Sequence, residues 1–491
     1  MDIQIDRQID MSLIDQIVKE IKKNIDRGIL KPGSQLPSIR IFSKTNNVSH
    51  VTVSKAYKKL EKIGLIELVH GKGAFVKNRK SSCTGYATVD SFDRSNWLSS
   101  LRTYVDSSAY TSINKKRIRF DFSEAIINPK LLPSDYLAEK VNQTLISSPK
   151  IISSYGLAQG EQKIRENIKN YIEKNGGFET SISNMIITSG VQQGIDIVAK
   201  AFIGPGDIVL VEESSYVHAL EVFSSRGAKI IAVPMDEYGL KINKLHTLCL
   251  EHKPKLVYTI PTFHNPTGVT LSLTRRKQLL NLARDHQFLI VEDDSWSDIY
   301  FDDKVPPPAI KSLDKEGCVI YLKGFSKYLS PGCRIGVIIP SDIIFPHLLA
   351  SKLITDLGSP ILTQQAASSF FNTNRMDDHL IKLRTALEIR RNQFILLLEK
   401  HLPSVVKWSE PTGGLNIWLT LPSGTDTLEL LEEAVKKGIS FLPGSFCDKN
   451  GKKSRHLRLS FSYIDTSDIV DGLIELCKII KSYLDHFKSD E

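Results

Sequence analysis

Residues 321–336 read YLKGFSKYLSPGCRIG. Lys327 stands in a turn rich in Gly, Ser and Pro, shortly after the apolar run CVIYL, and Arg334 follows it. A lysine at the end of a buried strand is removed from water, and a nearby cation further disfavours its charged form. Its pKa therefore falls, and the amine becomes able to form a Schiff base with an aldehyde. A lone strand-end lysine is otherwise a surface residue, so the neighbouring segments decide between the two interpretations.

The chain around this turn alternates helix-like segments with short apolar runs from about residue 120 onward. This pattern predicts an α/β fold with a mainly parallel sheet and helices on both faces. Each apolar run leads into a polar or glycine-rich turn: MIIT into SGVQQGI, DIVLVE into ESSYVHA, LVYTI into PTFHNPTG, FLIVE into DDSW, and CVIYL into KGFSK. Because ligands bind at the carboxyl ends of parallel strands, we expect these turns to converge on one cleft.

Residues in these turns match the needs of a phosphorylated pyridine aldehyde. Its phosphate requires a cation and the N–H groups of a helix start, which Arg334 and the segment Gly190-Val191-Gln192 would supply. Its ring nitrogen requires a carboxylate that keeps the ring protonated. Asp293 is the candidate for this carboxylate, and Asp294 next to it is the alternative.

Two further residues are candidates for contacts with the ring. Asn265 in HNPTG is expected to donate a hydrogen bond to the phenolic oxygen, although Asn before Pro is also a common turn former. Tyr216 is expected to stack on the ring, and its alternative is a place in the core.

The first eighty residues differ from this body in both charge and pattern. They carry a net charge of +8, from 16 Lys and Arg against 8 Asp and Glu, out of +9 for all 491 residues. Three helices are expected in SLIDQIVKEIKKNIDRGIL, SIRIFSKTNN and VSHVTVSKAYKKLEKIGLI, the last capped by Ser49, and a hairpin in LIELVHGKGAFV. This order predicts a winged helix-turn-helix that contacts DNA phosphates, with Lys72 at the wing tip.

Composition sets the remaining bounds. The stretch 79–116 is rich in Ser and Thr and predicts a linker between a DNA-binding domain at 1–78 and a large domain at 117–491. The six cysteines are scattered without a CxxC pair, which favours a reducing compartment and gives no sign of a zinc site. Without a bilayer-length apolar run or an apolar leader, the chain is expected to be cytoplasmic, with no membrane partner.

The basic segment resembles the GntR family of bacterial transcription regulators through GILKPGSQLPSIR, VSHVTVSKAYKKLEKIGLI and HGKGAFV. The resemblance implies DNA contacts from Arg40, Ser49, His50, Thr52 and the wing around Lys72. His50 stands where the family usually has Arg, and a neutral His attracts phosphate less. The alternatives are a surface cation for Arg40, a helix cap alone for Ser49 and a helix-surface residue for Thr52.

Residues 120–485 resemble the fold-type I pyridoxal-5′-phosphate (PLP) enzymes of the aspartate aminotransferase-like group. Six motifs in the family's order carry the resemblance: YGLAQGEQKIRENI, SGVQQGI, PTFHNPTG, VEDDSW, GFSKYLSPGCRIG and LRLSF. It implies a mainly parallel, seven-stranded-type sheet and a smaller C-terminal α+β subdomain. It also implies roles for individual residues: Lys327 as the Schiff-base lysine, Asp293 at the ring nitrogen, Asn265 at the ring oxygen, Tyr216 stacked on the ring, and Arg334 with Ser326 at the phosphate.

The same resemblance implies an effector site and a dimer. Arg458 in LRLSF matches an arginine that binds a substrate carboxylate, with a structural ion pair as the alternative. Tyr155 in YGLAQG matches a tyrosine that reaches the partner subunit's cofactor, which implies active sites shared in a homodimer. Trp296 stands where the family usually has a Tyr near the cofactor oxygen, and Gly324 where many members have a phosphate-binding Ser. Both departures weigh against efficient transamination more than against cofactor binding.

Along its whole length the chain resembles the MocR subfamily, in which a GntR-type reader precedes an aminotransferase-like body. The resemblance implies a PLP-dependent transcription regulator that senses PLP or an amino compound through an aldimine at Lys327. Members often control vitamin B6, amino-acid or amine metabolism genes. One alternative is an active aminotransferase with an appended DNA-binding module, and another is an interaction scaffold without the cofactor.

Overall fold

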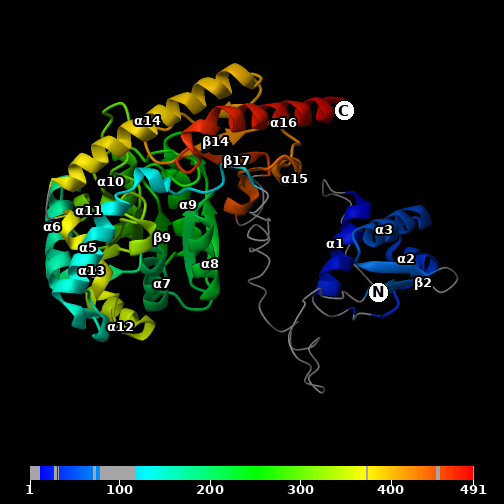
Figure 1. Cartoon of the computed structure of the whole chain (residues 1–491). Coiled ribbons are helices and arrows are strands. Elements are labelled where there is room, and N and C mark those ends of the chain that lie inside the picture. The colour runs from blue at the N-terminus through cyan, green and yellow to red at the C-terminus, as the bar shows by residue number, and fades with distance from the viewer. Residues whose placement is uncertain are drawn as a thin grey trace. The chain divides into compact units, whose positions relative to one another are not determined.

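The computed structural model describes residues 12–26, 30, 33–69, 73–77, 118–371, 374–448 and 454–489. The chain divides into two compact units, Met1–Tyr110 and Thr111–Glu491 (Figure 1). The predicted linker at 79–116 and the predicted wing-tip residue Lys72 lie outside the described residues, so both stay predictions.

The N-terminal unit is a helix-turn-helix followed by a hairpin. Its elements are α1 (Leu13–Asp26), α2 (Ile39–Asn46), α3 (His50–Lys62), β1 (Ile66–Val69) and β2 (Gly73–Val76). Asn47 caps the carboxyl end of α2, and its left-handed backbone (φ 51°) turns the chain toward Ser49, the N-cap of α3. Strands β1 and β2 pair antiparallel and form the wing. The predicted winged helix-turn-helix is confirmed.

A small core holds these elements together. Ile17 and Ile21 of α1, Phe42 of α2 and Leu60 of α3 are fully buried. The Tyr57 hydroxyl donates a 2.8 Å hydrogen bond to the Pro37 carbonyl, so α3 is tied to the segment that precedes α2. The opposite side of α3 is left to solvent, as the sequence pattern predicts.

The large unit is built on a seven-stranded sheet in the order β4-β12-β11-β10-β9-β5-β6. The strands are β4 (Ile186–Thr188), β5 (Ile208–Glu212), β6 (Lys229–Val233), β9 (Leu256–Thr259), β10 (Leu289–Asp294), β11 (Val319–Gly324) and β12 (Gly336–Ile339). Strand β12 runs antiparallel to both neighbours, and the other adjacent pairs are parallel. A mainly parallel seven-stranded sheet is therefore confirmed.

Helices cover both faces of this sheet. On one face, Val257 and Ile290 pack with Leu245 of α9 and Leu279 of α10. On the other face, α7 packs against β11 and β12. The helices of this part are α5 (Ser134–Ser147), α6 (Gln162–Asn175), α7 (Val191–Phe202), α8 (Val217–Ser225), α9 (Ile242–His252), α10 (Leu273–His286), α11 (Ile310–Leu313), α12 (Phe345–Thr355) and α13 (Ile361–Phe371).

A smaller α+β subdomain follows, as predicted. Its antiparallel sheet has the order β13-β14-β17-β16, and Figure 1 shows the long helices α14 and α16 beside it. Its elements are α14 (Arg375–His401), β13 (Lys407–Trp408), β14 (Asn416–Thr420), α15 (Thr427–Lys436), β15 (Ile439–Ser440), β16 (Leu442–Pro443), β17 (His456–Ser460) and α16 (Ile469–Ser489). The short strand β3 (Phe120–Asp121) pairs with β15, so the chain entering the large unit lies beside this subdomain. Within the described ranges, every helix is too short or too polar to span a bilayer.

Candidate cofactor site and DNA-binding face

Lys327 lies in the turn after β11, at the carboxyl end of the sheet. Its Nζ donates a 2.9 Å hydrogen bond to the carbonyl of Ala125, and the ammonium lies 5.4 Å from the centre of the Trp296 ring. Burial, followed by the charges of Arg458 and Arg334, lowers the pKa of Lys327 to about 8. An amine with this pKa is partly neutral near neutral pH and therefore nucleophilic, as the sequence predicts.

Asp293 lies at the end of β10 on the sheet face that α7 covers. Its carboxylate accepts hydrogen bonds from Tyr258 Oη at 2.7 Å and from Ser295 Oγ at 2.8 Å. Burial raises the pKa of Asp293 to about 6, against the effect of these two donors. The group is therefore mainly an anion above that pH, which suits a partner for a protonated ring nitrogen.

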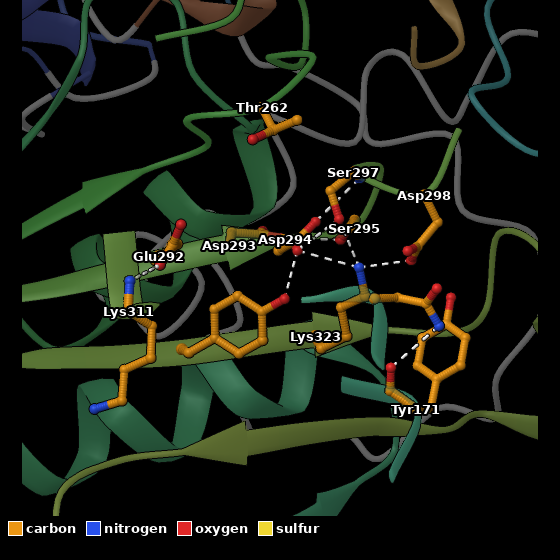
Figure 2. Close-up of polar contacts among 12 residues, drawn as sticks. Tyr171, Thr262, Glu292, Asp293, Asp294, Ser295, Ser297, Asp298, Lys311 and Lys323 are labelled. Atoms are coloured by element: carbon orange, nitrogen blue, oxygen red, sulfur yellow. Dashed lines mark hydrogen bonds and ion pairs between the residues drawn. The ribbon is translucent and has the colours of Figure 1, made fainter. Parts of the chain in front are cut away.

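Asp294, the alternative to Asp293, points to the opposite face because side chains alternate along a strand. It accepts hydrogen bonds from Tyr321 Oη at 2.5 Å, Ser297 Oγ at 2.7 Å and Lys323 Nζ at 3.1 Å (Figure 2). Burial alone would raise the pKa of Asp294, but Lys323 and these donors hold it below its ordinary value. These contacts favour Asp293 as the carboxylate that faces the site.

The start of α7 and Arg334 form a cradle for an anion. Gly190 caps α7 with a backbone (φ 82°, ψ 173°) that glycine alone adopts readily, and the Arg334 guanidinium donates to the Ser189 carbonyl at 2.7 Å. A Cβ on Gly190 would lie 2.9 Å from Arg334 Nη2, so the glycine makes room for the arginine. The first-turn N–H groups, from Val191 and Gln192, have no carbonyl partner within their helix. A phosphate fits this donor set.

Gly324, the second departure from the family pattern, is tightly enclosed. A Cβ there would lie 2.9 Å from Val191 Cγ2 and 3.3 Å from Ser295 Oγ. A serine at 324 would therefore require Val191 or Ser295 to move, and glycine avoids both contacts. Ser326, the other predicted phosphate ligand, lies half-buried in the same turn.

Asn265 and Arg458 join the two subdomains at the cleft. Arg458 Nη1, on β17, donates to Asn265 Oδ1 at 2.8 Å, and its Nη2 donates to the Ser123 carbonyl at 2.5 Å. Because the Asn265 oxygen accepts from Arg458, its amide nitrogen is left oriented to donate elsewhere. Both side chains are buried, and Arg458 is the effector-carboxylate candidate that the sequence singles out.

The remaining ring-contact candidates lie near these groups. Tyr216 is the N-cap residue of α8 and is half-buried. Burial and the charge of Asp293 raise the pKa of Tyr216, and Arg458 and Arg334 act on it in the opposite direction. Trp296 is buried with its ring toward Lys327. The structure thus brings the predicted cofactor residues of this chain together.

Tyr155 is the exception, because 84% of its surface is exposed and it contributes to none of the contacts described above. A buried pair was also missed by the sequence reasoning. His264 Nε2 lies 3.0 Å from Glu212 Oε2, and Glu212 also accepts hydrogen bonds from Thr259 Oγ1 and Ile260 N. This pair fixes the loop that carries Asn265. The only sequence signal was an acid at the end of the apolar run DIVLVE.

The DNA-contact candidates lie on and beside the start of α3. Arg40, Ser49 and His50 are exposed and Thr52 is half-buried. Ser49 Oγ accepts a hydrogen bond from Thr52 N at 3.1 Å and lies 2.8 Å from Thr52 Oγ1, so it does cap the helix. Capping leaves the serine at the surface, where a DNA contact is compatible with it.

The fold and the site define a fold-type I transferase domain fused to a winged helix-turn-helix. Residues 128–473 match the family model for aminotransferase class I and II, and residues 13–76 match the model for bacterial regulatory proteins of the gntR family. The uncharacterized HTH-type transcriptional regulator YdfD of Bacillus subtilis is 32% identical over 469 residues, which is 95% of this chain and 96% of that relative.

Proteins named as aminotransferases match as well. Aromatic-amino-acid aminotransferase 1 of Thermococcus litoralis is 34% identical over 72% of this chain and 86% of its own length. The crystal structure of Pyrococcus horikoshii kynurenine aminotransferase, in complex with PMP, superposes with a TM-score of 0.74 at 32% identity, covering 80% of this chain and 97% of that one. The large unit of this chain therefore belongs to the aminotransferase class I and II family. With its GntR-type N-terminal segment, the chain belongs to the MocR subfamily of GntR-family transcription regulators.

Proposed function

We propose that the chain is a transcription regulator that binds operator DNA through residues 1–78 and binds PLP, with or without an amine effector, in residues 117–491. Residues 79–116 link the two. The observation that carries the proposal is Lys327, an amine with a lowered pKa beside the buried Asp293, in a chain that also contains a GntR-type winged helix. Because its proposed target is DNA, we propose that it acts in the cytoplasm.

Bound PLP supplies an aldehyde and a protonated ring that withdraws electrons. Lys327 would hold the aldehyde end of PLP through its amine, and Asp293 would hold the proton on the ring nitrogen. Asn265 would donate to the ring oxygen through the amide nitrogen that its contact with Arg458 leaves free for this purpose. The remaining contacts are assigned to Tyr216 and Trp296 at the ring, and to Arg334, Ser326, Gly190, Val191 and Gln192 at the phosphate.

An amino-acid effector would place its carboxylate on Arg458. The guanidinium lies close enough to act on the pKa of Lys327, so an amine and a carboxylate on one small molecule can reach both groups. A carboxylate that takes over the donors of Arg458 would replace its bonds to Asn265 and Ser123. Effector binding is thereby coupled to the contact between the two subdomains, which is the element proposed to change state.

An exposed apolar patch supports a homodimer. Ile152, Tyr155 and Leu157 are mainly exposed, as are Ile354 and Leu357. The two segments touch, because a Cβ on Gly358 would lie 2.5 Å from the carbonyl oxygen of Gly156. Apolar patches of this kind mark protein–protein contacts. We propose that a second copy covers the patch and that Tyr155 reaches the cofactor of that copy.

For DNA, we propose that the start of α3 enters the major groove. Arg40, Ser49, His50 and Thr52 would contact phosphates and base edges, and Lys72 would do so from the wing. A dimer presents two such faces, and an effector that alters their spacing alters operator affinity. The expected targets are genes of vitamin B6, amino-acid or amine metabolism.

An active aminotransferase is the second candidate function, favoured by the complete set of Lys327, Asp293, Asn265 and Arg334 and by the aminotransferase relatives. Trp296 weighs against it, because an indole N–H donates but does not titrate as a phenol does. The test is a fluorescence-anisotropy titration of the full chain on its own upstream DNA, with and without PLP and candidate amines, beside an assay for multiple turnover. PLP- or amine-dependent DNA affinity without turnover supports the regulator. Multiple turnover, together with a DNA affinity that changes with neither PLP nor any amine, supports the enzyme.

A further inference from the structure

A second lysine lies buried behind the cofactor site, four residues before Lys327. Lys323 on β11 pairs in register with Asp294 on β10, and only 3% of its surface is exposed. Its ammonium lies 2.6 Å from Asp298 Oδ2 and 3.1 Å from Asp294 Oδ2, and it donates to Ser297 Oγ at 2.7 Å (Figure 2). Two hydrogen bonds and an ion pair therefore surround the ammonium.

These contacts keep Lys323 charged. Burial alone would lower the pKa of Lys323, but the charges of Asp294 and Asp298 outweigh it and hold the pKa above its ordinary value. Lys323 is therefore no competitor of Lys327 as a nucleophile. It is a fixed positive charge with two carboxylates around it.

The same contacts reach both sides of the cofactor site. The loop between Asp294 and Asp298 carries Ser295, which donates to Asp293, and Trp296, whose ring faces Lys327. From Lys323 the chain runs through Gly324, Phe325 and Ser326 to Lys327. One ammonium thus ties the loop after β10 to the turn after β11. Asp293 directly precedes the first of these segments, and Lys327 lies at the end of the second. These are the two groups that would hold opposite ends of the cofactor ring.

We propose that Lys323 is a positioning residue that balances the charges of Asp294 and Asp298, so that Asp293 remains the ionised carboxylate facing the cofactor. The inference rests on the proposed binding of PLP. The negative charge of Asp294 acts directly on Asp293, since it contributes to the raised pKa of Asp293. Without Lys323, β11 would offer Asp294 only the hydrogen bond from Tyr321 and no positive charge, and Asp293 would take up a proton more readily.

Other charged or titratable groups face the two residues from neighbouring elements. Around Asp293 these are Tyr258 of β9, Glu212 of β5, Tyr216 at the start of α8, and Lys327. Around Lys323 and its two aspartates these are Tyr321 and Tyr328, Tyr171 of α6, Arg276 of α10, Glu292 of β10 and Arg384 of α14, which donates to the Asp298 carbonyl. All of them remain when Lys323 is replaced, so a change in pH dependence reports the loss of this one charge.

The test measures PLP affinity of the full-length protein by visible absorbance over a range of pH. Lys323→Met removes the charge, and the double variant Lys323→Met with Asp294→Asn restores the balance. Lys311→Met is the matched control, because Lys311 also bonds β11, through the carbonyl of Val319, but at the opposite end of that strand.

We expect Lys323→Met to weaken PLP about tenfold or more and to shift the loss of PLP to a higher pH. The PLP affinity of the double variant is expected to return to within about threefold of that of the unmodified protein. The PLP affinity of Lys311→Met is expected to equal that of the unmodified protein. A structural defect would not be repaired by removing a second polar group.

A folded Lys323→Met variant with unchanged affinity at every pH would overturn the inference, as would a double variant no better than the single one. If Lys323→Met does not fold, the double variant decides: near-normal affinity supports charge balance and a tenfold loss contradicts it. Failure of the unmodified protein to take up PLP would instead overturn the proposed function on which the inference rests.

Discussion

Gly190→Ala tests the phosphate cradle. The new Cβ would lie 2.9 Å from Arg334 Nη2 and 3.3 Å from Arg334 Cζ. The closest contact is the end of a flexible side chain, so we expect Arg334 to move and the fold to survive. The alanine must also adopt φ 82° and ψ 173°, a backbone that costs a residue with a Cβ about 1–3 kcal/mol.

The loss of affinity follows from what Arg334 would do. A hydrogen bond to a charged group contributes about 1.5–3 kcal/mol, and each 1.4 kcal/mol is about tenfold in affinity. If Arg334 no longer reaches the phosphate, PLP should bind roughly 10- to 150-fold more weakly. Pyridoxal lacks the phosphate, so its affinity for the variant should differ little from its affinity for the unmodified protein. The PLP-to-pyridoxal affinity ratio, measured by absorbance titration, is therefore the diagnostic quantity.

Gly177→Ala is the matched control, because Gly177 also has a positive φ (70°) but has no atom within 4 Å of its would-be Cβ. It carries a backbone penalty without a contact at the cradle. We expect reduced thermal stability in both variants and a reduced affinity ratio in Gly190→Ala alone. Equal ratios in the unmodified protein, the variant and the control would refute the assignment of this helix start to the phosphate.

Three further predictions concern the ring, the effector and DNA. PLP affinity should fall as the pH drops through about 6, where Asp293 gains a proton, and a spectroscopic pH titration of Asp293→Asn should show no such step. Because the pKa of Asp293 is higher in the folded protein than in the unfolded chain, protonation of Asp293 stabilises the folded protein as the pH falls from about 6 toward the ordinary carboxyl pKa. Titration of Asp293 therefore lowers PLP affinity in this range without unfolding the protein. Arg458→Lys, which loses the planar fork, should weaken an amino acid about tenfold or more but leave the matching amine without a carboxylate nearly unchanged in calorimetry. Ser49→Ala should cost about 1 kcal/mol of stability, because the hydrogen bond that caps the helix at Thr52 is lost, and it should weaken DNA binding measured by anisotropy. If Ser49 only caps the helix, the melting temperature alone would change.

Much of this site follows from strand ends that can be read in the sequence. Asp293 lies at the end of an apolar run and Lys327 and Asn265 lie shortly beyond one, and a parallel sheet brings such ends together. The N-cap of α3 at Ser49 could also be predicted from the sequence, because Ser49 bonds to Thr52, only three residues further along the chain.

The contacts that the sequence does not reveal depend on strand order. β12 pairs antiparallel with β4, and Gly336 lies opposite Thr188, so Arg334, just before β12, meets Gly190, just after β4. Lys323 ends an apolar run and has no sequence signal for its two aspartates until β10 and β11 are paired. The same holds for His264 and Glu212, which come from the ends of different strands.

The most direct measurement is reduction of the PLP-treated protein with borohydride, followed by peptide mass mapping. Reduction fixes PLP wherever it is attached to an amine. The account predicts one phosphopyridoxyl mass addition, on Lys327, that is absent in Lys327→Ala. A protein that stays untagged at saturating PLP, or a tag on Lys323 in place of Lys327, would contradict it.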